Sequence, residues 1–141
     1  MRLSVLVLAS ALVSGDFGPG KLGPGVPRCL DDGWMGENGP YIYEGIKYLR
    51  SQDLCQVPPA SCSRVSCSWS QAIVMCNENP EASFRASCRT LAFYARAVVE
   101  KCRKRVEDRD SLVDGFWYTY RPGLVSIPNT QVHVKVEPQA C

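Results

Sequence analysis

The single histidine, His133, limits the catalytic sites that this sequence can build. Any Ser-His-Asp or Cys-His arrangement would need it as the base. It lies in the run 131–137, where valines alternate with polar residues. Because successive strand residues point to opposite sides, we expect His133 on the solvent side of a strand, where it does not act as a catalytic base.

Neighbouring carboxylates are the second arrangement that could do chemistry. Asp31 with Asp32, or Glu107 with Asp108 and Asp110, could flank a glycosidic bond. Both groups lie in an expected loop or a mixed-charge run, which usually forms solvated surface. There is no glycine-rich phosphate loop either, so we expect no catalytic residue, no cofactor and no enzymatic activity.

The cysteines are the remaining reactive side chains, and there are eight: Cys29, Cys55, Cys62, Cys67, Cys76, Cys88, Cys102 and Cys141. An even number in a small exported chain predicts four disulfides and no free thiol. We expect no metal site, because the chain has no paired Cys-x-x-Cys motif and only one histidine. The sequence leaves the pairing of the cysteines open.

The first 15 residues have the order of a secretory signal peptide. Arg2 supplies the positive charge, residues 3–13 supply an apolar stretch too short to span a membrane, and Ser14 and Gly15 are small. Residues 16–28 are rich in Gly and Pro, so we expect a flexible arm there. A single disulfide-rich domain is expected at 29–141, in a protein that is secreted and extracellular.

A long amphipathic helix from Pro80 to about Val106 is the expected organising element. Apolar and cysteine side chains recur along it every three or four residues, at Phe84, Cys88, Leu91, Ala95, Val98 and Cys102. Asn79 would cap its start and Pro80 would suit its first position.

Two of the cysteines on this helix predict how it is fastened. Cys88 and Cys102 are 14 residues apart, about 21 Å along a helix, which is too far for them to pair with each other. We therefore expect two separate bridges, one near each end of the helix. The nearest candidate partners are Cys62, Cys67 and Cys76, followed by Cys55 and the two terminal cysteines.

Strands are expected around this helix. Residues 65–67 and 72–76 predict a hairpin, 115–120 an aromatic strand that stops at Pro122-Gly123, and 132–136 an alternating strand. Residues 56–63 are expected as a loop, and 30–53 as a short helix or turn, with an edge strand as the alternative. The expected fold class is α+β: an antiparallel sheet of about four strands with one long helix packed on it, stabilised by disulfides.

A basic run is the first candidate binding surface, formed by Lys101, Arg103, Lys104 and Arg105. It could bind phosphates or an anionic membrane, or it could be a solvated helix end offset by the acidic residues from Glu107 onward. After loss of the leader the chain keeps 15 of its 16 basic residues against 14 acidic ones, a formal net charge of +1. We therefore expect no nucleic-acid partner, and we do not expect membrane binding.

The aromatic residues are the second candidate surface, in residues 41–48 and 116–120. Along a strand, Trp117 and Thr119 cannot share a face with Phe116, Tyr118 and Tyr120. One of the two sets is therefore expected to be exposed. The candidate contact residues are Trp117 from one set and Tyr118 and Tyr120 from the other. Core packing is the alternative role.

The run from Arg64 to Asn79 (RVSCSWSQAIVMCNEN), followed by a cysteine-bearing helix and a terminal Val-x-Val strand that ends at Cys141, resembles a group of small secreted cysteine-rich proteins of filamentous fungi. That group is similar to the effectors and avirulence proteins of plant pathogens. The resemblance covers roughly residues 64–141. It implies a non-catalytic virulence factor that binds a host plant protein or a partner effector, and it leaves action inside host cells open.

Two other classes of function remain open. A killer-toxin-like protein would act on a membrane or channel, and an exposed basic patch would favour it. A secreted hydrolase inhibitor would present a rigid loop held by cysteines, for which residues 55–67 with Pro58-Pro59 are the candidate.

Overall fold

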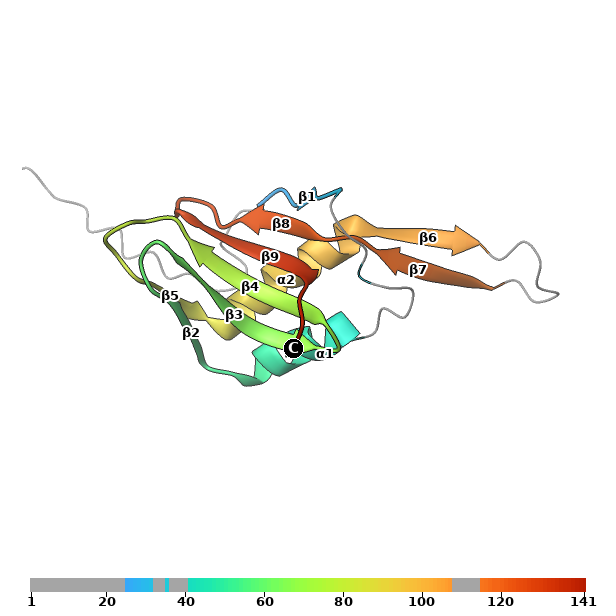
Figure 1. Ribbon diagram of the computed structural model, residues 1–141, viewed down its shortest axis with the longest axis horizontal. Helices are drawn as coiled ribbons and strands as arrows, with labels where there is room; N and C mark the ends of the chain where they lie inside the picture. The colour runs from blue at the N-terminus through green and yellow to red at the C-terminus, as the bar shows by residue number, and fades with distance from the viewer. Residues whose placement is uncertain (1–24, 32–34, 36–40, 108–114) are drawn as a thin grey trace, which may run out of the picture.

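Nine strands and two helices make up the described part of this computed structural model, which covers residues 25–31, 35, 41–107 and 115–141 (Figure 1). The expected leader at 1–15 and most of the arm at 16–28 lie outside the described residues. The elements are β1 (Arg28–Cys29), α1 (Tyr41–Ser51), β2 (Leu54–Val57), β3 (Ser61–Ser68), β4 (Gln71–Asn77), β5 (Phe84–Ser87), α2 (Cys88–Cys102), β6 (Arg103–Glu107), β7 (Phe116–Tyr120), β8 (Gly123–Ser126) and β9 (Val132–Pro138).

The largest element is a five-stranded antiparallel sheet in the order β1-β8-β9-β4-β3. The predicted strand at 132–136 is confirmed as β9: its three valines are buried, and it pairs with β8 on one side and β4 on the other. The predicted hairpin is confirmed as β3 and β4. The expected α+β class is therefore confirmed, with a wider sheet than the four strands expected.

Both helices cover one face of this sheet and pack against each other (Figure 1). The short helix anticipated within 30–53 is α1, and the core side chains Ile42, Ile46 and Leu49 are almost fully buried. Gly45 weakens a helix, but a Cβ there would lie 2.7 Å from Ser66 Oγ. The glycine therefore allows α1 to approach β3 closely.

The long helix predicted from Pro80 to Val106 is wrong at both ends. The helix runs only from Cys88 to Cys102, and Ser87 is its N-cap, with a side chain that accepts a hydrogen bond from the Arg89 N–H at 3.3 Å. Asn79 does accept the Glu81 and Ala82 N–H groups, at 2.9 and 3.0 Å, but it caps a turn.

The residues on either side of α2 pair with strands elsewhere in the sequence instead of extending the helix. Residues 84–87 form β5, which pairs with β2, and residues 103–107 form β6, which pairs with β7. The loop expected at 56–63 is correspondingly shorter, because β2 ends at Val57 and β3 starts at Ser61. Strand β8, directly after Pro122, was not anticipated.

All eight cysteines lie in the described part of the chain, and all are paired, which confirms the prediction of four disulfides. The bonds are Cys29–Cys102, Cys55–Cys88, Cys62–Cys76 and Cys67–Cys141. The separate bridges expected at the two ends of α2 are confirmed. The partners expected first are wrong, because the fold brings β1 and β2 to the helix ends.

Candidate functional site: the β6–β7 ribbon

Strands β6 and β7 form a two-stranded antiparallel ribbon that extends beyond the end of the five-stranded sheet (Figure 1). The register places Arg103 opposite Tyr120, Arg105 opposite Tyr118, and Glu107 opposite Phe116. The ribbon therefore joins the two candidate surfaces of the sequence, the basic run and the aromatic strand. Lys101, the remaining member of the basic run, is exposed in the last turn of α2.

Arginine side chains and aromatic rings alternate along one side of the ribbon, which we call the ladder face. The guanidinium carbon of Arg103 lies 4.4 Å from the centroid of the Tyr118 ring. That of Arg105 lies 4.1 Å from the centroid of Phe116. The rings of Phe116 and Tyr118 meet edge to face at 5.7 Å. Each cation lies over the electron-rich face of a ring, so the contacts hold the side chains in place while leaving them accessible.

Tyr43 of α1 anchors the base of the ladder face. Arg103 Nη1 donates a hydrogen bond to Tyr43 Oη at 3.4 Å, and the Tyr43 and Tyr120 rings meet edge to face at 6.2 Å. Tyr120 is buried, and burial raises the pKa of its hydroxyl above the usual value, with neighbouring Tyr43 adding to the rise. This tyrosine therefore stays neutral and belongs to the core.

Two backbone hydrogen bonds also tie the base of the ribbon to the rest of the molecule. The Met35 N–H donates to the Tyr120 carbonyl at 3.2 Å, and the Arg121 N–H donates to the Cys102 carbonyl at 3.3 Å. Cys102 is itself bonded to Cys29. Both strands of the ribbon therefore start from a fixed base.

The other side of the ribbon, which we call the opposite face, carries Lys104, Val106, Trp117 and Thr119. Thr119 is buried and its hydroxyl donates to the Lys104 carbonyl at 3.5 Å, whereas Trp117 is 42% exposed. The predicted separation of Trp117 and Thr119 from Phe116, Tyr118 and Tyr120 is confirmed. Exposure does not follow the faces, because Phe116, on the ladder face, is 51% exposed. The exposure of the β7 side chains increases instead from Tyr120 at the base of the ribbon to Phe116 at its far end.

The two strands of the ribbon are positively charged. They carry Arg103, Lys104 and Arg105 against the single carboxylate of Glu107. Glu100, near the end of α2, does not offset this charge, because it forms an ion pair with Arg96 at 2.6 Å. The two described strands of the ribbon therefore present exposed aromatic rings beside basic side chains.

Phe116 and Tyr43 lie in the two aromatic segments predicted as a candidate surface, but neither is among the individual contact residues predicted there. Phe116 had a local signal, since it alternates with Tyr118 and Tyr120 on a strand. No local signal linked Tyr43 to Arg103, because Tyr43 comes from a helix about sixty residues before Arg103 in the chain. Only the packing of α1 against the base of the ribbon brings it to this site.

The other candidates for chemistry are placed apart from the ribbon. His133 lies on the outer face of the sheet as expected, but its side chain is only 18% exposed, so the expected solvent exposure is largely wrong. Asp31 forms an ion pair with Arg121. Asp32, Asp108 and Asp110 lie outside the described residues. Within the described ranges, no group of three His, Cys, Asp or Glu side chains is placed to hold a metal ion.

No family model matches this sequence, and no curated protein and no solved structure matches it either. Among the described residues, no helix is long and apolar enough to cross a membrane.

Proposed function

We propose that this is a secreted, non-catalytic protein that acts by binding another protein through the β6–β7 ribbon. The observation that carries the proposal is the gathering of Trp117, Tyr118, Arg103 and Arg105 on one ribbon with a fixed base. Tryptophan, tyrosine and arginine are the residues that dominate the binding energy of protein interfaces. Since all eight cysteines are paired, none is available as a catalytic nucleophile.

The charge and shape of the ribbon define the partner it would fit. Exposed Phe116 and Trp117 would enter apolar hollows on the partner, one from each face of the ribbon. Arg105 and Lys104 would lie beside carboxylates, which would also speed association. The partner is therefore a protein with an acidic surface around an apolar groove.

The biological setting we propose is that of a fungal effector or avirulence protein that acts on a host plant protein or a partner effector. It rests on the resemblance of residues 64–141 to that group. Four disulfides in a chain of 141 residues are consistent with an extracellular protein.

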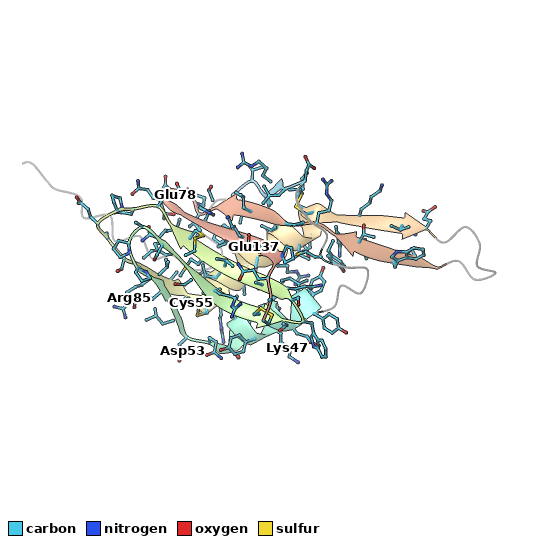
Figure 2. All side chains as sticks on the ribbon, viewed as in Figure 1. Lys47, Asp53, Cys55, Glu78, Arg85 and Glu137 are labelled. Atoms are coloured by element: carbon cyan, nitrogen blue, oxygen red, sulfur yellow. A yellow bond between two sulfur atoms is a disulfide. The ribbon has the colours of Figure 1, made fainter. Side chains whose placement is uncertain are left out.

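Inhibition of a secreted hydrolase is the second candidate, and it is favoured by the rigidity of the β2–β3 turn. The Pro58 carbonyl accepts hydrogen bonds from Ser61 Oγ at 2.9 Å and from Asn77 Nδ2 at 3.3 Å. The Ala60 N–H donates to the Asn79 carbonyl at 2.8 Å. Disulfides at Cys55 and Cys62 flank this turn (Figure 2 labels Cys55). Such a loop would bind with little loss of conformational entropy.

Action on a membrane or channel is the third candidate, and the exposed basic residues of the ribbon favour it. Lys101, Lys104 and Arg105 are all exposed. An anionic bilayer attracts such residues, but it does not require the ordered arginine and aromatic ladder. The ladder therefore favours a protein partner.

A binding experiment with the mature chain tests the proposal. Tagged wild-type protein would be incubated with host plant extract, and captured proteins compared with those held by Trp117→Ala, Arg105→Ala and the control Lys47→Ala, which changes an exposed lysine of α1. We expect a partner that both ribbon variants lose and the control keeps. A partner whose capture is lost in Pro59→Ala but kept in both ribbon variants would favour the inhibitor. Leakage of anionic vesicles caused by the wild-type protein with no partner present would favour the membrane function.

A further inference from the structure

The outer face of the sheet holds a cleft of about 350 Å³ that contains a disulfide and the single histidine of the chain. Cys62 of β3 lies directly opposite Cys76 of β4, and Cys76 lies directly opposite His133 of β9. Opposite residues in an antiparallel sheet point to the same side, so these three side chains form one row. Lys135 and Glu78 also line the cleft, and Figure 2 shows Glu78 at the end of β4.

The Cys62–Cys76 disulfide is more exposed to solvent than the disulfides that hold α2. Cys62 is exposed while Cys76 is buried, so the bond is more open to an attacking group on its Cys62 side than on its Cys76 side. Cys55 and Cys88 are both buried, whereas in the other bond Cys102 is buried and Cys29 is half-buried. Thiol exchange requires access to a sulfur, so the Cys55–Cys88 bond is protected in the folded protein and the Cys29–Cys102 bond is less accessible than Cys62–Cys76.

The charged and polar groups around Cys62–Cys76 differ from those around the other exposed disulfide, Cys67–Cys141. There, Cys67 Sγ lies 4.0 Å and Cys141 Sγ 3.8 Å from the carbonyl oxygen of Gln139. Disulfide sulfurs carry no hydrogen to donate, so the partial negative charge of that oxygen would disfavour a departing thiolate. In the cleft, the positive charge of Lys135 favours a thiolate at Cys76, and the negative charge of the more exposed Glu78 opposes it.

The cleft also keeps its walls when this bond opens. Strands β3 and β4 pair on both sides of the bond, from Ser61 to Ser68. Asn77 Nδ2 donates to the Ala82 carbonyl at 2.7 Å, which fixes the chain just beyond β4. The bond closes the shortest loop of the four, with a separation of 14 residues, so its removal frees the least chain entropy on unfolding.

We propose that Cys62–Cys76 is a thiol-exchange site that takes up a low-molecular-weight thiol. The external thiolate attacks Cys62 Sγ and forms a mixed disulfide there. The Cys62–Cys76 bond breaks, and Cys76 keeps its electron pair as a thiolate and takes up one proton. The external thiol supplies one proton when it becomes the thiolate, so the exchange needs no oxidant or reductant.

Lys135 assists as a positioning residue, and His133 is proposed as a general base for the incoming thiol. Burial lowers the pKa of His133 below its usual value, so the ring is neutral near pH 7 and can accept the proton of the incoming thiol. Glu78 Oε1 lies 3.8 Å from His133 Nδ1 and attracts the ring when it is protonated. The thiol-exchange site does not include the β6–β7 ribbon, so a negative result for thiol exchange would leave the proposed protein-binding function untouched.

Peptide mapping after treatment with reduced glutathione tests the proposal. The folded mature protein would be incubated with glutathione under native conditions, quenched in acid and digested. We expect the first adduct on Cys62, with a free thiol on Cys76 and the other three disulfides intact. A first adduct on Cys67, Cys141 or any cysteine of α2, or exchange only as the circular dichroism of the fold is lost, would overturn the proposal.

Variants sharpen the experiment. Lys135→Gln should slow the first exchange by about 2- to 5-fold, the range expected for a partly exposed charge, whereas Lys47→Gln on α1 should leave the rate unchanged. The double variant Cys62→Ser with Cys76→Ser should take up no glutathione under conditions that modify the wild type. If the double variant does not fold, mapping of the wild type still decides the question. Equal rates for Lys135→Gln and wild type would contradict the role of Lys135.

Discussion

The body of the molecule and the β6–β7 ribbon are stabilised in opposite ways. The body, made of the five-stranded sheet, both helices and the β2–β5 pair, contains all four disulfides and a core whose side chains are almost completely buried. The ribbon has no cysteine between Arg103 and Tyr120, and it leaves Phe116 and Trp117 about half exposed. Its order comes from strand pairing and from arginine on aromatic rings.

This difference shows how a small protein can keep a surface of exposed aromatic side chains. Exposed aromatic residues contribute little to stability where they lie, so other parts of the molecule must supply it. The Cys29–Cys102 bond ends one residue before the ribbon starts, which fixes its base without restricting its exposed side chains. The body therefore provides stability, and the ribbon is free to provide recognition.

The largest effect is expected from the body. Replacing Cys88 with Ser removes the bond to Cys55 at the start of α2. The free energy of unfolding should fall by about 2 to 5 kcal/mol, because a buried bond that closes a long loop is lost. Urea unfolding followed by circular dichroism measures it, with Lys47→Ala as the control. A loss below about 1 kcal/mol would mean that the Cys55–Cys88 bond contributes little to holding α2, which packing and the Cys29–Cys102 bond would then hold.

The ribbon should show the reverse pattern. The double variant Arg105→Ala with Phe116→Ala removes one arginine–ring pair of the ladder face. The free energy of unfolding should fall by about 0.5 to 1 kcal/mol, the usual contribution of an exposed pair, while partner binding is lost. Thermal unfolding and the capture experiment together measure this. A loss of stability as large as that of the Cys88 variant would remove the distinction between body and ribbon.

A smaller effect is expected at the β3–β4 turn of the body. Trp69 and Ser70 have φ angles of 49° and 62°, in the left-handed region that favours glycine. Ser70→Gly should raise the free energy of unfolding by up to about 1 kcal/mol. Ser63→Gly, within β3 and not at a positive φ angle, is the matched control and should lower it. A loss of stability for both variants would contradict this account of the turn.

The smallest effect concerns pH. Burial lowers the pKa of His133, with Lys135 adding to the fall while Glu78 and Glu137 oppose it. The unfolded chain therefore binds a proton before the folded one as the pH drops. Stability should fall as the pH drops through the usual histidine value near 6.5, and level off below the folded pKa. His133→Gln should remove this slope in urea unfolding between pH 7.5 and 5, and an unchanged slope would contradict it.

Some features of this protein follow from local sequence alone. Alternation of valine with polar residues predicted β9, helical spacing of Ile42, Ile46 and Leu49 indicated α1, and the even number of cysteines predicted full pairing. The distance along a helix excluded a Cys88–Cys102 bond, which the structure confirms. Each of these depends on a period or a distance within one segment, or on a count of one residue type.

The tertiary structure decided the rest, because strands pair with segments that the local pattern does not identify. Residues 84–87 and 103–107 fit the apolar period of α2, but pairing with β2 and β7 made them strands. The same pairing placed Arg103 and Arg105 over rings more than ten residues away in the sequence. The basic run and the aromatic strand could each be recognised in the sequence, but their union in one surface depended on long-range pairing.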